Sequence, residues 1–410
     1  MKRFFCMMLA LALCISLLPA AGLAFGENGK TKDDYVSLDS LAREHGFIMG
    51  ASFSYNQTMG KSSYLEFVKT HFSSITCTNE TKAYSLLDQK ASMASEDGMP
   101  VMNYWAADKM VKWAQDNGLK VRGHVLVWDA YMNDWFFRVD YDPNKPYADQ
   151  ETMRARTRSY IEQVITHFEE KFPGVIYCWD VVNEAIGDNA SEWDAKDARH
   201  LRTIRSGVDN LFKTHLGDDY VEFSFLCAKD TVEKLGADIT LFYNDYNMFF
   251  PEKRDAALAL IDSINHYAVD ENGEYRKLID GAGMQGYIGG YGVQDGCLED
   301  SHLDNIATAI RMYGEAGLEV HITEMAVRNF VKSDEMAAKH ADYYARLFQV
   351  FIDANSGDVK PLTCVAIWGL TDNPTAQGYV YNLNSPYGGL ITEKNKIKTS
   401  FDAVHAVLSK

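Results

Sequence analysis

The feature that most constrains this chain is the alternation of short apolar runs with longer amphipathic stretches. Eight runs have the length of a strand, and helical patterns lie between them. Strands that alternate with helices are typical of parallel sheets covered by helices. We therefore predict an α/β fold, a closed (β/α)8 TIM barrel. An open, doubly wound sheet is the alternative architecture for the same pattern.

The expected elements can be placed by residue range. The predicted strands are 46–52, 73–77, 120–128, 174–182, 239–244, 286–293, 318–323 and 363–370, and the predicted helices include 105–117, 151–171, 251–268, 303–316 and 335–353. Three polar segments, 136–156, 186–205 and 265–285, are longer than minimal barrel loops. The first two follow strands three and four, so we expect them to shape the rim of a cleft.

The N-terminus has the pattern of a secretory signal peptide. Lys2 and Arg3 precede an unbroken apolar stretch, and small residues follow around Ala24. We expect residues 1–24 to be a signal peptide and residues 25–410 to be a single barrel domain, exported from the cell. An N-terminal membrane anchor is the alternative. No second apolar run is long enough to span a bilayer, and no Pro/Ser-rich linker marks a further module.

Charge and cysteine spacing narrow the possible partners. The 410 residues carry a net charge of -17, which disfavours nucleic acid and anionic lipid but is compatible with a neutral polysaccharide. The seven cysteines are scattered, with no spacing typical of a metal site or of a dense disulfide framework. We therefore predict no metal, no cofactor and no nucleic-acid or membrane partner, and we expect a monomer.

Polar and tryptophan side chains gather where the predicted strands end. They are His124, Trp128, Asn183, Glu184, Asn244, Asp245, Gln294, Glu324 and Trp368. Catalytic groups of such barrels lie at the carboxyl ends of the strands, and a carboxylate that ends a buried run is costly unless it is paired or used. Glu184 and Glu324 follow strands four and seven, which face each other across a barrel. Glycoside hydrolysis needs two such carboxyl groups, and tryptophan faces suit sugar rings.

The motifs around these residues resemble glycoside hydrolase family 10, the family of retaining endo-β-1,4-xylanases, from about residue 45 to the C-terminus. "WDVVNEA" at 179–185 is similar to the acid/base motif, and "HITEM" at 321–325 is similar to the nucleophile motif. The resemblance implies that Glu184 is the general acid/base and that Glu324 is the nucleophile. It implies a secreted enzyme that cleaves xylan or a related β-1,4-linked plant polysaccharide.

The same resemblance implies a set of substrate contacts. "NETK", "VRGHVLVW", "WDVVNEA", "LFYNDYN", "GVQ" and "IWGLTD" match family motifs and carry over Asn79, Lys82, His124, Trp128, Asn183, Asn244, Tyr246, Gln294 and Trp368. Asn79 and Lys82 are implied to lie further from the leaving group, and Asn244 and Tyr246 near it.

Several positions depart from the family pattern. Gly296 stands where a His usually supports the nucleophile, and Ala326 where an Asp orients that His. Other departures are Thr78 for Glu, Ala83 for Trp, Asp129 for His and Tyr131 for Gln. We therefore expect Glu324 to lack a donor and to be held loosely, with a rate lowered by about a hundredfold.

Asp129 or Asp295 could build a different polar network in compensation. Two alternatives stay open beside the working xylanase. One is a catalytically silenced, glycan-binding barrel, and the other is a β-glycanase with altered substrate specificity.

Overall fold

Eight parallel strands close into a barrel in the computed structural model, which describes residues 26–289, 298–373 and 385–410. They are β1 (Ile48–Phe53), β2 (Ser74–Cys77), β3 (Lys120–Gly123), β4 (Ile176–Asn183), β7 (Thr240–Tyr246), β8 (Gly281–Gln285), β10 (Glu319–Val327) and β11 (Leu362–Ile367). Each strand pairs with the next, and β11 pairs with both β10 and β1, which closes the ring. The predicted (β/α)8 barrel is confirmed.

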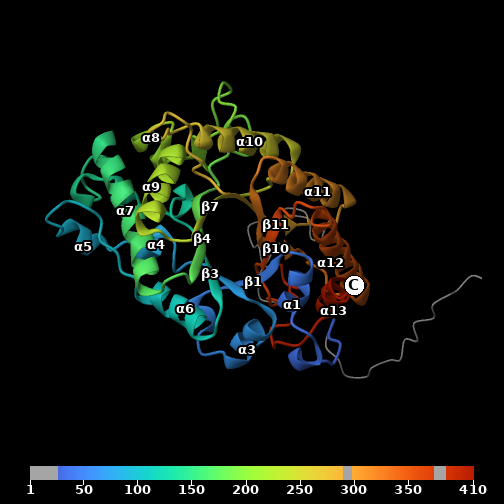
Figure 1. Cartoon of the computed structure of the whole chain (residues 1–410). Coiled ribbons are helices and arrows are strands. Elements are labelled where there is room, and N and C mark those ends of the chain that lie inside the picture. Colours follow the sequence, from blue (N-terminus) through green and yellow to red (C-terminus); the bar gives the residue numbers. More distant parts are fainter. Residues whose placement is uncertain (1–25, 290–297, 374–384) are drawn as a thin grey trace, which may run out of the picture.

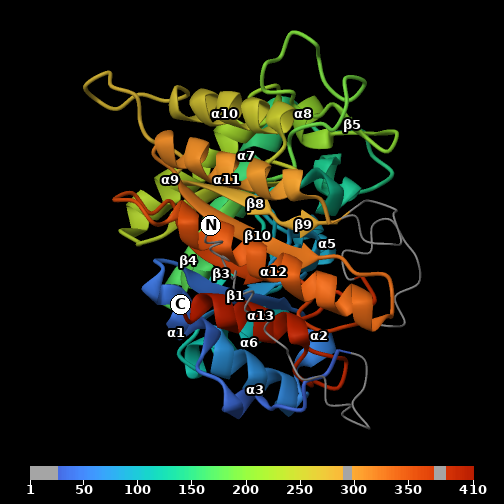
Figure 2. The same cartoon turned by 90° about the vertical axis from the view of Figure 1, so that its right-hand side faces the viewer.

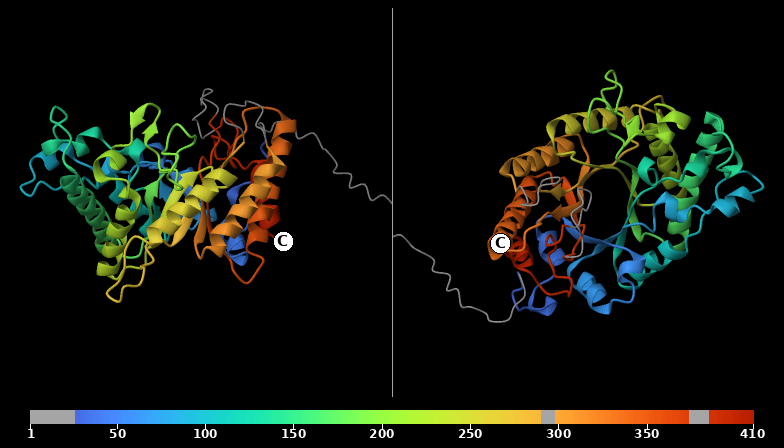
Figure 3. Two further views of the ribbon diagram at one scale, coloured as in Figure 1. Left: turned by 90° about the horizontal axis from the view of Figure 1, so that it is seen from above. Right: turned by 180° about the vertical axis from the view of Figure 1, so that it is seen from behind.

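Helices surround the strands as an outer ring, which is visible from the front and from behind (Figure 1, Figure 3). The longer ones are α1 (Leu38–Glu44), α3 (Ser62–His71), α6 (Trp105–Asp116), α7 (Gln150–Lys171), α9 (Tyr220–Leu235), α10 (Pro251–Asn265), α11 (Asp300–Glu315), α12 (Asp334–Ala354) and α13 (Thr399–Leu408). Residues at the N-termini of α7 and α10 favour the start of each helix. The Asp149 carboxylate accepts from the first turn of α7, and Pro251 opens α10.

The sixth barrel strand corrects the sequence prediction. It is β8, whereas 286–293 was predicted and the residues of β8 were assigned to a polar loop. Its residues "GAGMQ" include few large apolar side chains, so they do not resemble a strand. They are nevertheless fully buried, and a Cβ at Gly281 would overlap the ring of Phe242 on β7. Small residues here allow close packing of neighbouring strands inside the barrel.

Loops at the carboxyl ends of the strands build one face of the molecule. They carry the short helices α2 (Tyr55–Thr58), α4 (Ala83–Leu86), α5 (Gln89–Met93) and α8 (Leu211–Leu216), the hairpin β5 (Ile204–Arg205) and β6 (Val208–Asp209), and β9 (Tyr287–Ile288). Figure 2 shows β5, β9 and α2 at the same end of the barrel. None of the helices in the described ranges is both long and apolar enough to cross a membrane.

A buried ion pair joins two neighbouring strands inside the barrel. Arg122 on β3 donates two hydrogen bonds to the Asp180 carboxylate on β4, and Nδ1 of His124 lies 2.8 Å from the same carboxylate. Arg122 also donates to Nδ1 of His321 on β10. The side chains of Arg122 and Asp180 are 1% and 0% exposed, so each charge depends on the other for stabilisation.

Replacing Asp180 with Ala should lower the free energy of unfolding by about 3–5 kcal/mol, because Arg122 would be left as an uncompensated buried charge. Chemical denaturation followed by circular dichroism measures this change. The control is Asp116→Ala, which removes an exposed pair with Lys112 and should cost less than about 0.5 kcal/mol. Equal effects of the two substitutions would contradict a structural role for the interior pair.

Candidate active site

The first catalytic candidate lies directly after the end of β4. Glu184 adopts a left-handed backbone conformation with φ 54, which is uncommon for a residue with a side chain and is typical of functional sites. Its N–H donates to the Asn244 carbonyl on β7 at 2.9 Å, which fixes this turn. Its carboxyl group therefore leaves the wall of the barrel at the carboxyl end of the strands.

Three amide side chains connect Glu184 with the second candidate, Glu324 on β10. Gln285 Nε2 donates to Glu184 Oε1 at 3.0 Å and to Asn183 Oδ1 at 3.2 Å. Asn244 Nδ2 donates to Asn183 Oδ1 at 2.8 Å and to Glu324 Oε1 at 3.1 Å. The structure thus brings the two predicted glutamates to one network, with Asn183 and Asn244 between them.

Glu324 is firmly held, so the expectation that it lacks a donor is wrong. Asn244 donates to one carboxylate oxygen, and the Tyr287 hydroxyl donates to the other. The expectation rested on Gly296, which lies outside the described residues, as do Gln294 and Asp295. Tyr287 follows Gln285 by two positions, so the Gln-Gly-Tyr sequence at 285–287 places one side chain on each of the two glutamates.

The alanine at position 326 lies beside Tyr287. Ala326 pairs in register with Tyr287 and packs in one cluster with it and with Trp368. A histidine that supports a carboxylate has a second ring nitrogen that needs its own hydrogen-bond partner, whereas a tyrosine hydroxyl has a single proton to donate. Tyr287 therefore needs no carboxylate behind it, and Ala326 leaves room for the phenol ring.

The electrostatic setting of Glu184 suits a proton donor. Burial raises the pKa of Glu184 to about 7, the Arg205 cation opposes this rise, and the negative charges of Asp245 and Glu324 add to it. Carboxyl groups that stay protonated near neutral pH serve as general acids. Glu184 can therefore donate a proton in a pH range in which an ordinary carboxyl group would be ionised.

Three predicted contact residues carry buried polar atoms without a hydrogen-bond partner among the described residues. They are His124 Nε2, Trp128 Nε1 and Asn183 Nδ2. The other His124 nitrogen faces Asp180, which assigns its proton to that side. Buried polar atoms in native proteins are nearly always paired, so these three are suited to receive the hydroxyl groups of a polar ligand.

The remaining predicted contacts that the structure describes include Lys82, Asn79 and Tyr246. Burial lowers the pKa of Lys82 to about 8, while both glutamates oppose this change, and its ammonium lies over the Trp128 and Tyr131 rings. Asn79 precedes it on the same loop after β2. Tyr246 packs on the cluster of Tyr287, Ala326 and Trp368, but its hydroxyl contacts Asp188 and Arg202.

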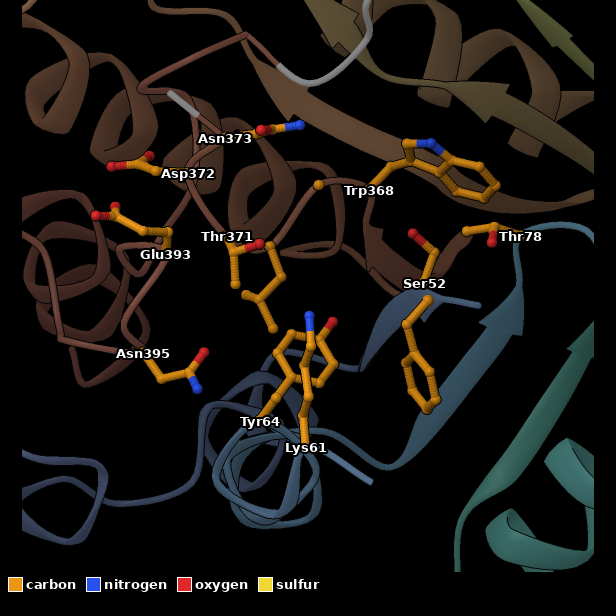
Figure 4. Close-up of a pocket in the computed structure, with 13 residues that line it drawn as sticks. Ser52, Lys61, Tyr64, Thr78, Trp368, Thr371, Asp372, Asn373, Glu393 and Asn395 are labelled. Atoms are coloured by element: carbon orange, nitrogen blue, oxygen red, sulfur yellow. The ribbon is translucent and has the colours of Figure 1, made fainter. Parts of the chain in front are cut away.

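A pocket of about 370 Å³ opens beside Trp368, between the ends of β1, β2 and β11. Figure 4 shows Trp368 and Thr78 on one side of it and Asp372, Glu393 and Asn395 on the other. Thr78 Oγ1 is a further buried polar atom without a partner in the part of the chain that the structure describes. The pocket therefore extends the polar and aromatic lining away from the two glutamates.

Sequence reasoning missed Gln285, Tyr287 and Arg205. The first two were missed because the sixth strand was placed too late in the chain, although the Gln-Gly-Tyr spacing could have located both. Arg205 Nη1 donates to Glu184 Oε2 at 2.9 Å. It comes from the predicted rim segment 186–205, and no motif in the sequence points to it.

Two carboxyl groups at one barrel mouth, one of them with a pKa near neutrality, are equipped for transfer at a glycosidic bond. The fold and the site thus define a glycoside hydrolase. A family model, "Glycosyl hydrolase family 10", matches residues 37–406. The chain belongs to glycosyl hydrolase family 10.

Named relatives agree with this assignment. The chain is 37% identical over 301 residues to a protein of Caldicellulosiruptor saccharolyticus, an inferred endo-1,4-beta-xylanase by name, covering 71% of this chain and 86% of that protein. It is 31% identical to endo-1,4-beta-xylanase B of Butyrivibrio fibrisolvens, covering 81% of this chain but 47% of that protein.

Solved structures of similar proteins share the fold. The Clostridium thermocellum N-terminal endo-1,4-beta-D-xylanase 10B, a CBM22-1-GH10 structure complexed with xylohexaose, superposes with a TM-score of 0.73 at 25% identity, covering 93% of this chain and 68% of that chain. Xylanase XynB of Paenibacillus barcinonensis, complexed with a conduramine derivative, gives a TM-score of 0.69 at 25% identity, covering 90% and 98%.

Replacing Tyr287 with Phe should lower kcat by roughly tenfold to a hundredfold, because one donor to the Glu324 carboxylate is lost while the ring that fills the cluster remains. Steady-state kinetics with an oligosaccharide that the wild-type protein cleaves measures the change in kcat. Tyr267→Phe removes a hydroxyl that donates to Asp219 in a different hydrogen-bonded pair and should keep the wild-type kcat. A Tyr287→Phe protein with wild-type kcat would show that the hydroxyl does not support Glu324.

Proposed function

We propose that the protein is a secreted, retaining endo-β-1,4-xylanase that acts on xylan or a related β-1,4-linked polysaccharide. The observation that carries the proposal is the pair of glutamates in one amide network, Glu324 with two donors and Glu184 with its pKa raised to about 7. These are the different environments that a nucleophile and a general acid require.

The mechanism assigns one task to each carboxyl group. Glu324 attacks the anomeric carbon, and the bond to the leaving oxygen breaks as Glu184 gives its proton to that oxygen. Glu184, now ionised, takes a proton from water, whose oxygen then attacks the same carbon and displaces Glu324. Two displacements at one carbon retain its configuration. The amide network supports this division of roles, because Asn244 touches the nucleophile and Gln285 touches the acid.

The substrate class is supported by the relatives and by the lining of the site. Relatives are named as xylanases, and one similar structure contains xylohexaose. The aromatic faces of Trp128 and Trp368 and the unpaired atoms near them suit the rings and hydroxyl groups of a neutral sugar chain. Export is supported by the charged and apolar pattern of residues 1–24, and N-terminal sequencing of the exported protein tests it.

An altered substrate range is the second candidate, and the pocket beside Trp368 favours it. This pocket could take a substituent of a branched chain, because it is lined by polar side chains and adjoins the site. Catalysis is favoured over glycan binding alone, because hydrogen bonds hold both glutamates.

The wild-type protein should release reducing ends from plain xylan, and Glu184→Ala should lower this rate by about a hundredfold or more, because the leaving oxygen loses its proton donor. The same assay on arabinoxylan, β-glucan and mannan gives the substrate range. Proton NMR during the first minutes should show the β-anomer as the new reducing end.

Glu315→Ala on the surface of α11 is the matched control, because Glu315 is exposed and forms an i,i+4 ion pair with exposed Arg311. Its activity should equal that of the wild type. Saturable binding of xylo-oligosaccharides without hydrolysis would show that the protein is a glycan-binding barrel and not an enzyme. An initial α-anomer would exclude the retaining mechanism.

A further inference from the structure

Arg205 reaches the acid/base from a small hairpin that the loop after β4 contributes. Ile204 and Arg205 pair with Asp209 and Val208, and the turn between them has positive φ at Ser206 and Gly207. A two-residue turn with both φ values positive matches the twist of a hairpin. The position of Arg205 is therefore set by a defined turn.

Hydrogen bonds attach this hairpin to the barrel. Asn210 donates to the Arg202 carbonyl at 3.1 Å, and buried Arg202 donates to the Ile186 carbonyl at 2.8 Å. Ile186 and Leu201 form an isolated antiparallel bridge just after β4. The segment that carries Arg205 is thus tied to the residues that directly follow Glu184.

The guanidinium of Arg205 contacts Glu184 twice. Nη1 donates to Glu184 Oε2 at 2.9 Å, and Nη2 donates to the Glu184 carbonyl at 2.9 Å. The first contact orients the carboxyl group, and the second supports the left-handed backbone of the same residue. Because Gln285 holds the other carboxylate oxygen, the Glu184 rotamer is fixed from two sides.

Asp129 holds the opposite edge of the same guanidinium. Nε and Nη2 of Arg205 donate to its two carboxylate oxygens, both at 2.9 Å. Such a bidentate pair fixes the plane of the guanidinium as well as its position. The Asp129 side chain is 8% exposed and that of Arg205 is 21% exposed, so solvent screens this pair only in part. This is the alternative polar network that the sequence allowed for at Asp129.

The charges around Glu184 show why both partners are needed. Arg205 is the cation that touches the carboxyl group, whereas Lys82 acts on it from the β2 side. The negative charges that face it come from Asp245 and Glu324. Among the described residues, Tyr131 after β3, Tyr246 at the end of β7 and Arg202 after β4 are further titratable groups near it.

An arginine alone beside a general acid favours the ionised form, which cannot donate a proton. A carboxylate on the far side of that arginine offsets part of its charge. Asp129 therefore lets Arg205 hold Glu184 in place without making Glu184 a strong acid.

We propose that Arg205, held by Asp129, is a positioning residue that orients the Glu184 carboxyl group and sets the pH range in which this group donates a proton. The inference rests on the proposed function, because it takes Glu184 as the acid/base. It adds to that function a charge-balanced pair that the loop after β4 and the loop after β3 supply together.

The test follows the Glu184 carboxyl directly by ¹³C NMR titration of protein labelled at glutamate, with the signal assigned by its loss in Glu184→Gln. Arg205→Met should raise the titration midpoint by about 1 pH unit, because the contacting cation is removed. Asp129→Asn should lower the midpoint by about 0.5 pH unit, because Arg205 then acts without its counter-charge. The double variant should return toward the wild type.

The alkaline limb of the pH profile of kcat/KM on a xylo-oligosaccharide reports loss of the proton from the acid. This limb should therefore move to higher pH in Arg205→Met and to lower pH in Asp129→Asn. On the xylo-oligosaccharide, Arg205→Met should also lower kcat/KM by about tenfold. On a dinitrophenyl glycoside, whose leaving group needs no proton, the decrease should be much smaller. Arg205→Lys should restore part of the wild-type profile. Arg276→Met removes an arginine of similar exposure that pairs with Asp230 and should change neither measurement.

The proposal would be overturned if the Glu184 titration midpoint did not move in Arg205→Met and Asp129→Asn, or moved in the same direction in both. A rise in KM with no other change would also overturn it. The double variant removes both charges, so it decides the question if the single Arg205 variant fails to fold. Because the titration needs no substrate, opposite midpoint shifts in a protein that cleaves no glycan would retain the positioning role and reject the proposed function.

Discussion

The site depends on the hydrogen bonds of three amides, Asn183, Asn244 and Gln285, which hold two carboxyl groups at the mouth of one barrel. Each amide lies on a different barrel strand, at or near its carboxyl end, so closure of the sheet sets the geometry of the site. An amide can donate to a carboxylate without adding charge, so it fixes the position of that group. For Glu184, the Gln285 hydrogen bond also lowers the pKa that burial raises. Rigid strands thus place the groups that catalysis needs at fixed separations.

Two carboxyl groups in the same network have different surroundings. Glu324 receives hydrogen bonds from neutral donors, Asn244 and Tyr287. Glu184 lies in a buried position against a cation, with other negative charges near it. The chain reaches this asymmetry with its own residues. The Tyr287 hydroxyl donates to Glu324, Ala326 packs beside the Tyr287 ring, and the hairpin supplies an arginine that contacts Glu184.

Much of this arrangement could be predicted from the sequence, because it depends on patterns that the strands impose. The predicted strands that Glu184 and Glu324 follow located both candidates, although the structure places Glu324 inside β10, and barrel closure brings the two together. The sixth strand was misplaced because "GAGMQ" lacks the bulky residues that mark a strand, and its small residues reflect close packing against Phe242. Because of that error, Gln285 and Tyr287 were not predicted as site residues.

Arg205 could not be predicted, because its position depends on the tertiary course of a long loop.

The most direct measurement is peptide mapping by mass spectrometry after reaction with a 2-deoxy-2-fluoro xylobioside that carries a good leaving group. The fluorine slows release of the glycosyl-enzyme, so the sugar should remain covalently attached to Glu324 in the wild-type protein. Glu324→Gln should take up no label. Cleavage of xylan by a protein that carries the label on another residue, or that is never labelled, would contradict the central assignment.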